Sequence, residues 1–356
     1  MAGGRGAGRV SDAALPPVIG DEAQLEELLA RPSAADVAFV RALKGDVAVL
    51  GAGGKMGPSL ARRIRRAADQ AGAHTRVVAV SRFSDAGLAR ALEADGIECA
   101  PCDLLDARQV EALPDFANVL YLSGMKFGSW DRPDLTWMQN TVAPAHVMGR
   151  FARSRIVAFS TGNVYPLVDA ASGGCAESVR PAPLGEYAQS CLGRERVFEY
   201  GAQEHGTPTL LFRLFYAVDL RYGTLPDIAR KVWAGEPVDV TVGHVNALWQ
   251  GDANSYALRG LALCASPARA LNVTGPDVIS VRKAALFFAQ RFGREARLVG
   301  AERGPCLLGD AALCGRLLGP PAVTTAELME WCAAWVEKGG RSLGKPTKFE
   351  RTDGRF

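Results

Sequence analysis

The sequence has little that points to a membrane, a nucleic acid or a metal. Its longest apolar runs, such as VAVLGAG and NVLYLSGM, have the length of strands and cannot span a bilayer. Lysine and arginine (41) barely outnumber aspartate and glutamate (38), and no basic stripe with interleaved aromatics is present. Histidine occurs only four times. We therefore expect no nucleic-acid partner, no membrane contact and no metal site.

The first 20 residues also lack the apolar core of a secretion signal and are expected to form a flexible leader. Eight cysteines in a chain without an export signal indicate reduced thiols and a cytoplasmic location. Cys99 and Cys102 have CxxC spacing, but no second CxxC and no histidine cluster completes a zinc site. We expect both to pack as small apolar side chains.

From Asp46 onward, strand-length and helix-length patterns alternate. Helices are expected at 58–72 and 87–96, and a late helix at about 327–339. Buried strands are expected at 47–51, 75–82, 97–104, 118–124, 155–161 and 207–215. This alternation predicts an α/β fold, a Rossmann-type doubly wound parallel sheet covered on both faces. Past about residue 216 the elements shorten, which indicates a smaller C-terminal lobe.

A glycine-rich loop, GAGGKMG, lies between the first expected strand and its helix. Gly51, Gly54 and Gly57 allow a tight turn and close approach of a pyrophosphate, and the helix N-terminus offers free N–H groups. The alternative is a tight turn without a ligand. The strand–helix–strand context favours a dinucleotide site.

The end of the second expected strand bears on the choice of dinucleotide. NAD-binding proteins usually have an acidic residue there, which holds the ribose hydroxyls. Ser81 and Arg82 stand at that place, and an arginine suits a 2′-phosphate. We therefore favour NADP(H) over NAD(H), with a solvent-facing Arg82 as the alternative.

Four separated motifs resemble the NAD-dependent epimerase/dehydratase family of extended short-chain dehydrogenase/reductases. Beside GxxGxxG, they are FSTGNVYP (159–166), FRLFYAVDLRYG (212–223) and LNVTGPDVISVRKAALFFAQRFG (271–293). Tyr187 follows Tyr165 by 22 residues, about where this family places its catalytic tyrosine. The similarity covers about residues 46–337.

The resemblance implies a division of the chain and a set of cofactor contacts. The expected parts are an N-terminal extension (1–45), a dinucleotide-binding Rossmann domain (46–215), a substrate lobe (216–338) and a basic flexible tail (339–356). The expected cofactor contacts are Gly51, Gly54, Lys55, Met56, Gly57, Ser81, Arg82, Asp103, Leu104, Ser123 and Gly124.

The resemblance also implies catalytic roles. Tyr187 takes the position of the tyrosine that acts as acid or base, Thr161 that of the Ser/Thr that binds the same oxygen, and Asn140 that of a helix asparagine. The family has a lysine four residues after the tyrosine, whose charge lowers the pKa of the phenol. Cys191 stands there instead. We expect Lys126 to supply the charge, with Arg194 or Arg196 as alternatives.

Two departures from the family pattern limit the reaction. Gly162 and Asn163 stand where sugar 4,6-dehydratases carry an Asp-Glu pair, which argues against water elimination. Phe215-Tyr216 replaces an asparagine that often contacts a nucleotide sugar, so a smaller polyol, sugar or sugar acid is expected. Candidate substrate contacts are Arg213, Arg221, Asn246, Gln250 and Asp252.

The leading hypothesis from the sequence is an NAD(P)-dependent oxidoreductase or epimerase acting on a hydroxyl or keto group of a carbohydrate-like molecule. The alternative is a cofactor-binding protein that has lost catalysis and acts as a regulator or subunit, because the lysine is missing. The resemblance also implies a homodimer, formed through the helices that contain TWMQNTVAPAHVMGRF and YAQSCLGRERVFEY.

Overall fold

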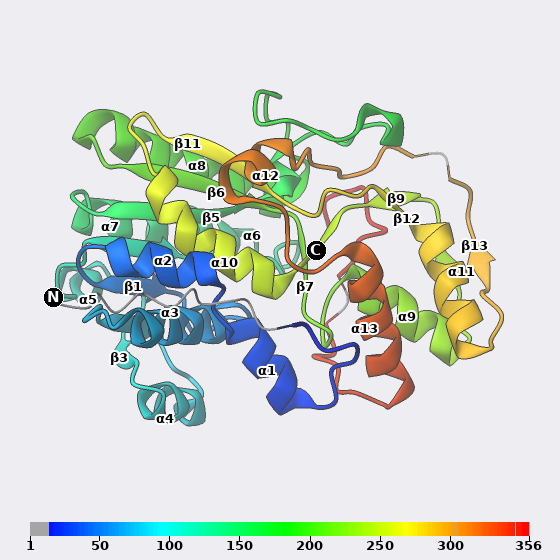
Figure 1. Ribbon diagram of the computed structural model, residues 1–356. Helices are drawn as coiled ribbons and strands as arrows, with labels where there is room; N and C mark the ends of the chain where they lie inside the picture. The colour runs from blue at the N-terminus through cyan, green and yellow to red at the C-terminus, as the bar shows by residue number, and fades with distance from the viewer. Residues whose placement is uncertain (1–13, 303, 346, 356) are drawn as a thin grey trace, which may run out of the picture.

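The computed structural model describes residues 14–302, 304–345 and 347–355. Its centre is a parallel sheet of seven strands in the order β11-β6-β5-β4-β1-β2-β3 (Figure 1). The strands are β1 (Val47–Leu50), β2 (Val77–Ser81), β3 (Glu98–Pro101), β4 (Asn118–Tyr121), β5 (Arg155–Thr161), β6 (Thr209–Leu214) and β11 (Arg269–Val273). The first six are the six strands expected from the sequence, and β11 begins the late strand motif.

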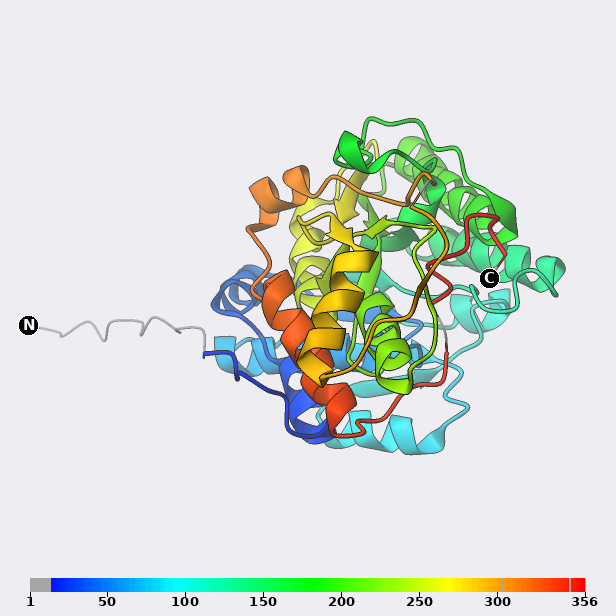
Figure 2. The ribbon, with the colours of Figure 1, turned by 90° about the vertical axis from the view of Figure 1, so that its right-hand side faces the viewer.

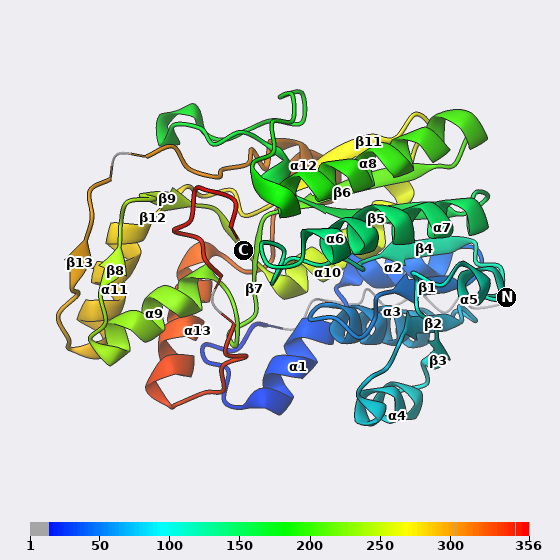
Figure 3. The same cartoon turned by 180° about the vertical axis from the view of Figure 1, so that it is seen from behind.

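Helices cover both faces of the sheet, which confirms the doubly wound α/β fold. Val47 and Val49 of β1 pack into one apolar core, whereas Ala48 and Leu50 pack into the other. The first face carries α2 (Ala34–Ala42), α3 (Gly57–Ala71) and α10 (Gln250–Gly260), which lie in front of the sheet in Figure 1. The second carries α5 (Ala107–Glu111), α6 (Pro133–Trp137), η1 (Met138–Val142), α7 (Ala143–Arg150) and α8 (Gly185–His205), seen in front in Figure 3. Helix α4 (Ala86–Ala94) connects β2 to β3.

The strand order determines where a ligand can bind. Chain connections from β1 and β4 run in opposite directions across the sheet, so the carboxyl ends of these strands border a crevice. The glycine loop after β1 and the segment after β4 both lie there. This crevice is where the site is built.

Two short helices precede the sheet, one on either side of Pro32. Helix α1 (Glu22–Ala30) is capped by Asp21, and α2 begins with a capping box formed by Ser33 and Asp36. The Asp36 carboxylate also accepts a 2.8 Å bond from Arg63 Nε of α3, which ties the extension to the Rossmann domain. Residues 1–13, most of the expected leader, lie outside the described residues.

A second core lies beside the sheet, at the right of Figure 1. Its principal helices are α9 (Thr224–Ala234), α11 (Val281–Phe292) and α13 (Thr325–Glu337). Short strands accompany them, namely β7 (Tyr216–Val218), β8 (Val238–Asp239), β9 (His244–Val245), β10 (Ala247–Trp249), β12 (Ile279–Ser280) and β13 (Leu298–Val299). The remaining elements are α12 (Ala312–Leu318) and the short helices η2 (Gly162–Val164), η3 (Ala170–Ser172) and η4 (Leu261–Leu263). The domain boundaries drawn from the sequence stay a prediction.

The basic segment after α13, expected to be flexible, packs against the second lobe over part of its length. Thr347 and Phe349 are each 2% exposed, and Phe349 joins the core of this lobe. The reason is that Asp227 of α9 accepts bonds from both the Thr347 N–H and hydroxyl, at 2.8 and 2.6 Å. No helix among the described residues is long and apolar enough to cross a membrane.

Candidate functional site

The glycine loop lies closely against the segment that follows β4. Gly51 has a φ of +89°, and a Cβ there would lie 2.7 Å from the Ser123 backbone nitrogen. A Cβ on Gly57 would lie 2.4 Å from the Ala52 carbonyl oxygen. Both positions therefore require glycine, because backbone on the opposite side cannot move away. The loop leads directly into the 15 residues of α3.

A cavity of about 560 Å³ extends from this loop along the ends of β2, β3 and β4. It is the right size and shape of pocket for part of a large cofactor. Seven of the sequence-predicted cofactor contacts line it together with Gly51, namely Gly54, Ser81, Arg82, Asp103, Leu104, Ser123 and Gly124. The tertiary structure thus brings these dispersed residues to one crevice.

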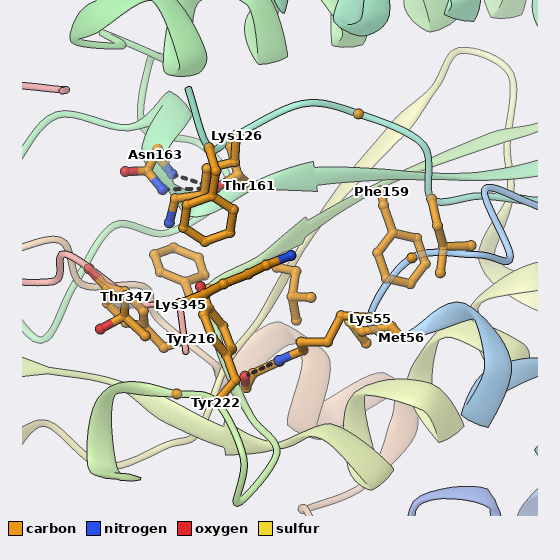
Figure 4. Close-up of a pocket in the computed structure, with 18 of the residues that line it drawn as sticks. Lys55, Met56, Lys126, Phe159, Thr161, Asn163, Tyr216, Tyr222, Lys345 and Thr347 are labelled. Atoms are coloured by element: carbon orange, nitrogen blue, oxygen red, sulfur yellow. Dashed lines mark hydrogen bonds between the residues drawn. The ribbon is translucent and has the colours of Figure 1, made fainter. Parts of the chain in front are cut away.

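A second cavity of about 430 Å³ continues from the first, and the two share Gly51, Gly54, Leu122, Gly124, Lys126 and Phe127. The other predicted loop residues, Lys55, Met56 and Gly57, line this second cavity. Thr161 and Tyr187 line it too. Figure 4 shows several of these side chains around the cavity. A long ligand lying across both cavities would therefore end beside Thr161 and Tyr187.

Thr161 and Tyr187 line the same cavity although they belong to different elements. Thr161 ends β5 and Tyr187 lies in the first turn of α8. The Thr161 hydroxyl accepts a 3.0 Å bond from Asn163 Nδ2. Burial raises the pKa of Tyr187 above its usual value, the Cys191 thiol acts in the same direction, and the nearby Arg194 guanidinium opposes them.

Cys191 lies one helical turn after Tyr187 and is fully buried. Burial raises the pKa of its thiol, so the side chain is held in its neutral form. Asn140 Nδ2 lies 4.0 Å from its sulfur. A neutral buried thiol cannot supply the positive charge that the resemblance implies at this position.

Two cations approach Tyr187. Lys126, half-buried in the segment after β4, has its ammonium 5.7 Å from the centroid of the Tyr187 ring. Burial lowers the pKa of Lys126 to about 8. Arg194, one turn beyond Cys191, is 6% exposed and donates to the Phe159 carbonyl at 2.9 Å and to Asn140 Oδ1 at 2.5 Å.

Arg194 is unusual because it is a buried charge without a carboxylate partner. Within residues 14–302, 304–345 and 347–355, no carboxylate oxygen lies within salt-bridge distance of its guanidinium. Its neighbour Glu195 pairs instead with Arg213, at 2.9 and 2.7 Å. A Cβ on Gly124 would lie 2.1 Å from Arg194 Nη2, so this cation lies directly beneath the wall of the cofactor crevice.

Asn140, expected in a catalytic role, is placed behind the site. It is fully buried in the π-helical turn η1 and is absent from the described lining of both cavities. Its side chain accepts from the Met125 N–H at 2.9 Å and donates to the Met125 carbonyl at 3.0 Å and to Ser190 Oγ at 2.9 Å. It therefore holds the Lys126 segment against α8.

The two departures at Gly162 and Phe215 are physically linked. A Cβ on Gly162 would lie 2.4 Å from the Phe215 ring, and one on Gly309 would also lie 2.4 Å from it. The ring thus fills the space between two glycines and borders the smaller cavity. A side chain at position 162, such as the aspartate of the dehydratase pair, would clash with this ring.

The five candidate substrate contacts do not reach either cavity, and this part of the sequence interpretation is corrected. All five are buried and engaged within the protein, because each satisfies a polar group of the scaffold. Their partners are Glu195 for Arg213, Asp219 for Arg221, Asp277 for Asn246, Ser59 for Gln250 and the backbone of Ala322 and Val323 for Asp252.

The CxxC pair packs as expected. Cys102 is buried, Cys99 is partly buried, and burial raises the pKa of both thiols. Across the part of the chain that the structure describes, no group of three or more potential ligand side chains is positioned to hold a metal ion.

Sequence reasoning missed several residues that line the smaller cavity. Lys345 and Thr347 come from the segment after α13, and Tyr222 from the loop before α9. The only signal for Lys345 was the basic character of the tail, which carries no information about where the tail lies. Lys55 was expected at the cofactor, but its ammonium reaches across the crevice to the Ala217 carbonyl at 3.0 Å.

Comparison with known proteins decides the family. The model of the "NAD dependent epimerase/dehydratase family" matches residues 47–243, more than half of the chain. The protein belongs to this family. It is thus a member of a family of enzymes, and the resemblance inferred from the four motifs is confirmed. No curated protein matches the sequence significantly.

Solved structures of the epimerase/dehydratase family share the fold. MoeE5 in complex with UDP-glucose and NAD is 22% identical, with a TM-score of 0.66 over 83% of this chain and 99% of that one. The UDP-Glc/GlcNAc 4-epimerase of Campylobacter jejuni is 18% identical, with a TM-score of 0.67 over 83% and 100%. DesIV, a dTDP-glucose 4,6-dehydratase from Streptomyces venezuelae, is 17% identical, with a TM-score of 0.69 over 82% and 97%.

Proposed function

We propose that this family member is an NAD(P)-dependent oxidoreductase or epimerase that acts on a hydroxyl or keto group of a sugar, polyol or sugar acid. The observation that carries the proposal is the Thr161–Tyr187 pair, which lines the cavity continuous with the glycine-loop crevice. A nicotinamide dinucleotide fits this crevice, because the glycine loop lines it and leads directly into the N-terminus of α3, whose free N–H groups can bind a pyrophosphate. When bound, such a cofactor accepts or supplies a hydride.

The side chains of this chain would handle the proton. Tyr187 is in a position to give a proton to a substrate oxygen or to take one from it, and the Thr161 hydroxyl is in reach of the same oxygen. Arg194 favours the phenolate of Tyr187, and Lys126 brings a second positive charge to the cavity. The Asn140 bonds to Met125 keep the Lys126 segment in place.

NADP(H) is the preferred cofactor in this proposal because Arg82 lines the adenosine half of the crevice. Replacing Arg82 with aspartate is expected to weaken NADPH binding by about 10- to 100-fold, since a charge-assisted bond to phosphate is lost. NADH binding is expected to change little. Quenching of tryptophan fluorescence by each dinucleotide measures both constants. Arg90→Asp, on the exposed side of α4, is the matched control. Equal losses for NADPH and NADH would contradict the preference.

The proposed activity is tested by NADPH binding, and then with a panel of sugars, polyols, sugar acids and lactones. Absorbance at 340 nm detects net oxidoreduction, and chromatography of the products detects epimerisation, which leaves the cofactor unchanged overall. Turnover of any of them supports the enzyme. Binding without turnover across the panel favours the regulator or subunit, for which the loss of the lysine at Cys191 is the supporting observation. Failure to bind either dinucleotide would contradict both.

A homodimer through the α6–η1 and α8 region is part of the proposal. Trp137 and Met138 are 38% and 44% exposed there, which is high for large apolar side chains. Sedimentation velocity is expected to give a dimer for the native chain and a monomer for Met138→Asp. A monomeric native chain at micromolar concentration would contradict this expectation.

A cytoplasmic location is also proposed. All eight cysteines are free thiols in the structure, as suits a reducing compartment.

A further inference from the structure

The segment after α13 crosses the opening between the two lobes. It continues from α13 through Gly340, whose N–H donates to the Trp335 carbonyl at 2.8 Å. The Leu343 N–H then donates to the Arg221 carbonyl at 3.0 Å, and Thr347 is held by Asp227 of α9. In Figure 3 this segment (red) rises from the end of α13 toward the middle of the molecule.

The far end of the segment lies against the Rossmann domain. The Arg355 guanidinium is 4.0 Å from the centroid of the Trp130 ring, in the loop before α6. A Cβ on Gly185, the first residue of α8, would lie 2.4 Å from the Gly354 carbonyl oxygen. Tyr187 follows two residues later. Figure 2 shows the C-terminal end beside the helices of this face.

The segment brings a third lysine to the smaller cavity. Lys345 enters from the side of the second lobe, whereas Lys55 comes from the glycine loop and Lys126 from the segment after β4 (Figure 4). The ammonium groups of Lys126 and Lys345 each lie 5.9 Å from the centroid of the Phe127 ring. Among the described residues that line this cavity there is no aspartate or glutamate.

Three like charges around a concave site repel one another unless an anion lies between them. Burial lowers the pKa of Lys55 to about 8, as it does for Lys126. At Lys55 the Asp219 carboxylate opposes this shift, and the charges of Arg221 and Lys126 add to it. The cavity therefore favours a negatively charged occupant.

We propose that the C-terminal segment forms an anion subsite with Lys345 as its central cation, and that the substrate is a carbohydrate-like molecule bearing a phosphate or carboxylate. This proposal deepens the proposed function and rests on it for the identity of the reaction. The competing source of the anion is the pyrophosphate of the dinucleotide, which the glycine loop would hold. Lys345 distinguishes the two, because it reaches the cavity from the opposite side of the crevice.

Calorimetric titration of the NADP⁺-saturated protein separates these sources. Glucose 6-phosphate and glucuronate are expected to bind at least about tenfold more tightly than glucose, and comparison of the two anions tells phosphate from carboxylate. Lys345→Met is expected to remove about tenfold of this preference while NADPH affinity stays within twofold. Lys345 is exposed, so the variant is expected to fold. Lys283→Met removes the same charge from an exposed position of α11 and is expected to leave both the anion preference and the NADPH affinity unchanged.

No preference for either anion over glucose, or an undiminished preference in Lys345→Met, would overturn the proposal. Equal weakening in Lys283→Met would also overturn it, because the effect would then come from overall charge. If neither dinucleotide binds, the proposed function fails separately. In that case titration of the cofactor-free protein with inorganic phosphate still tests the subsite, and loss of binding in Lys345→Met supports it.

Discussion

Replacing Tyr187 with phenylalanine is expected to lower kcat by roughly 10²- to 10⁴-fold, the usual contribution of a general acid or base. The change removes the phenolic hydroxyl that would pass a proton to or from the substrate oxygen. The nearby Arg194 cation assists this transfer because it favours the phenolate of Tyr187. NADPH affinity is expected to stay within twofold, since the glycine loop and the adenosine crevice are untouched. Initial rates and fluorescence titration measure the two quantities.

The matched control for Tyr187→Phe is Tyr200→Phe. Tyr200 lies further along the same helix and is 63% exposed, far from the cavity. It is expected to leave kcat unchanged. A Tyr187→Phe variant that keeps native turnover would show that the proton moves by another route and would remove Tyr187 from the mechanism.

Replacing Arg194 with methionine is expected to lower kcat by roughly 10- to 100-fold and to move the pH profile. Its guanidinium opposes the rise that burial causes in the pKa of Tyr187, so its loss raises that pKa further. A smaller fraction of the tyrosine is then ionised at any given pH. In the direction that needs a base, the rising limb of the pH–rate profile should therefore move to higher pH. Initial rates across the pH range measure this shift.

A purely structural role for Arg194 would give a different result, because its bonds to Phe159 and Asn140 also join helix to sheet. Arg194→Lys keeps the charge and is expected to keep most of the pH profile. Installing the family lysine as Cys191→Lys in the Arg194→Met background is expected to restore part of kcat. Loss of activity together with a lowered Tm, an unmoved pH profile and no rescue would count against the electrostatic role.

Lys126→Met tests whether Lys126 or Arg194 supplies the positive charge beside Tyr187. The sequence points to Lys126 as the replacement for the lysine, and its ammonium does lie over the Tyr187 ring. If Lys126 supplies the missing charge, this variant abolishes turnover, whereas Arg194→Met remains active. The reverse order of losses would assign that role to Arg194.

The sequence signals for the glycine-loop crevice are local. A glycine-rich loop between a strand and a helix, or a polar residue at the end of a parallel strand, can be placed from the sequence, because the carboxyl ends of parallel strands meet at one edge of the sheet. Gly51, Ser81 and Asp103 accordingly line one cavity at this edge, and their contact with a cofactor stays a prediction. Thr161 and Tyr187 come together because α8 is the helix that connects β5 to β6, so its first turn lies near the carboxyl end of β5.

The sequence by itself determined the strand–helix alternation, the nucleotide loop, the tyrosine position and the absence of its lysine. Only the tertiary structure decided that Asn140 is buried behind the site, that Arg194 lies unpaired beneath Gly124, and that Lys345 faces the cavity. These outcomes depend on contacts between distant parts of the chain, such as Glu195 taking Arg213 as its partner and Asp227 holding Thr347. Such contacts cannot be predicted from periodic patterns in the sequence, because each needs only one partner residue and that partner can lie at almost any distance along the chain.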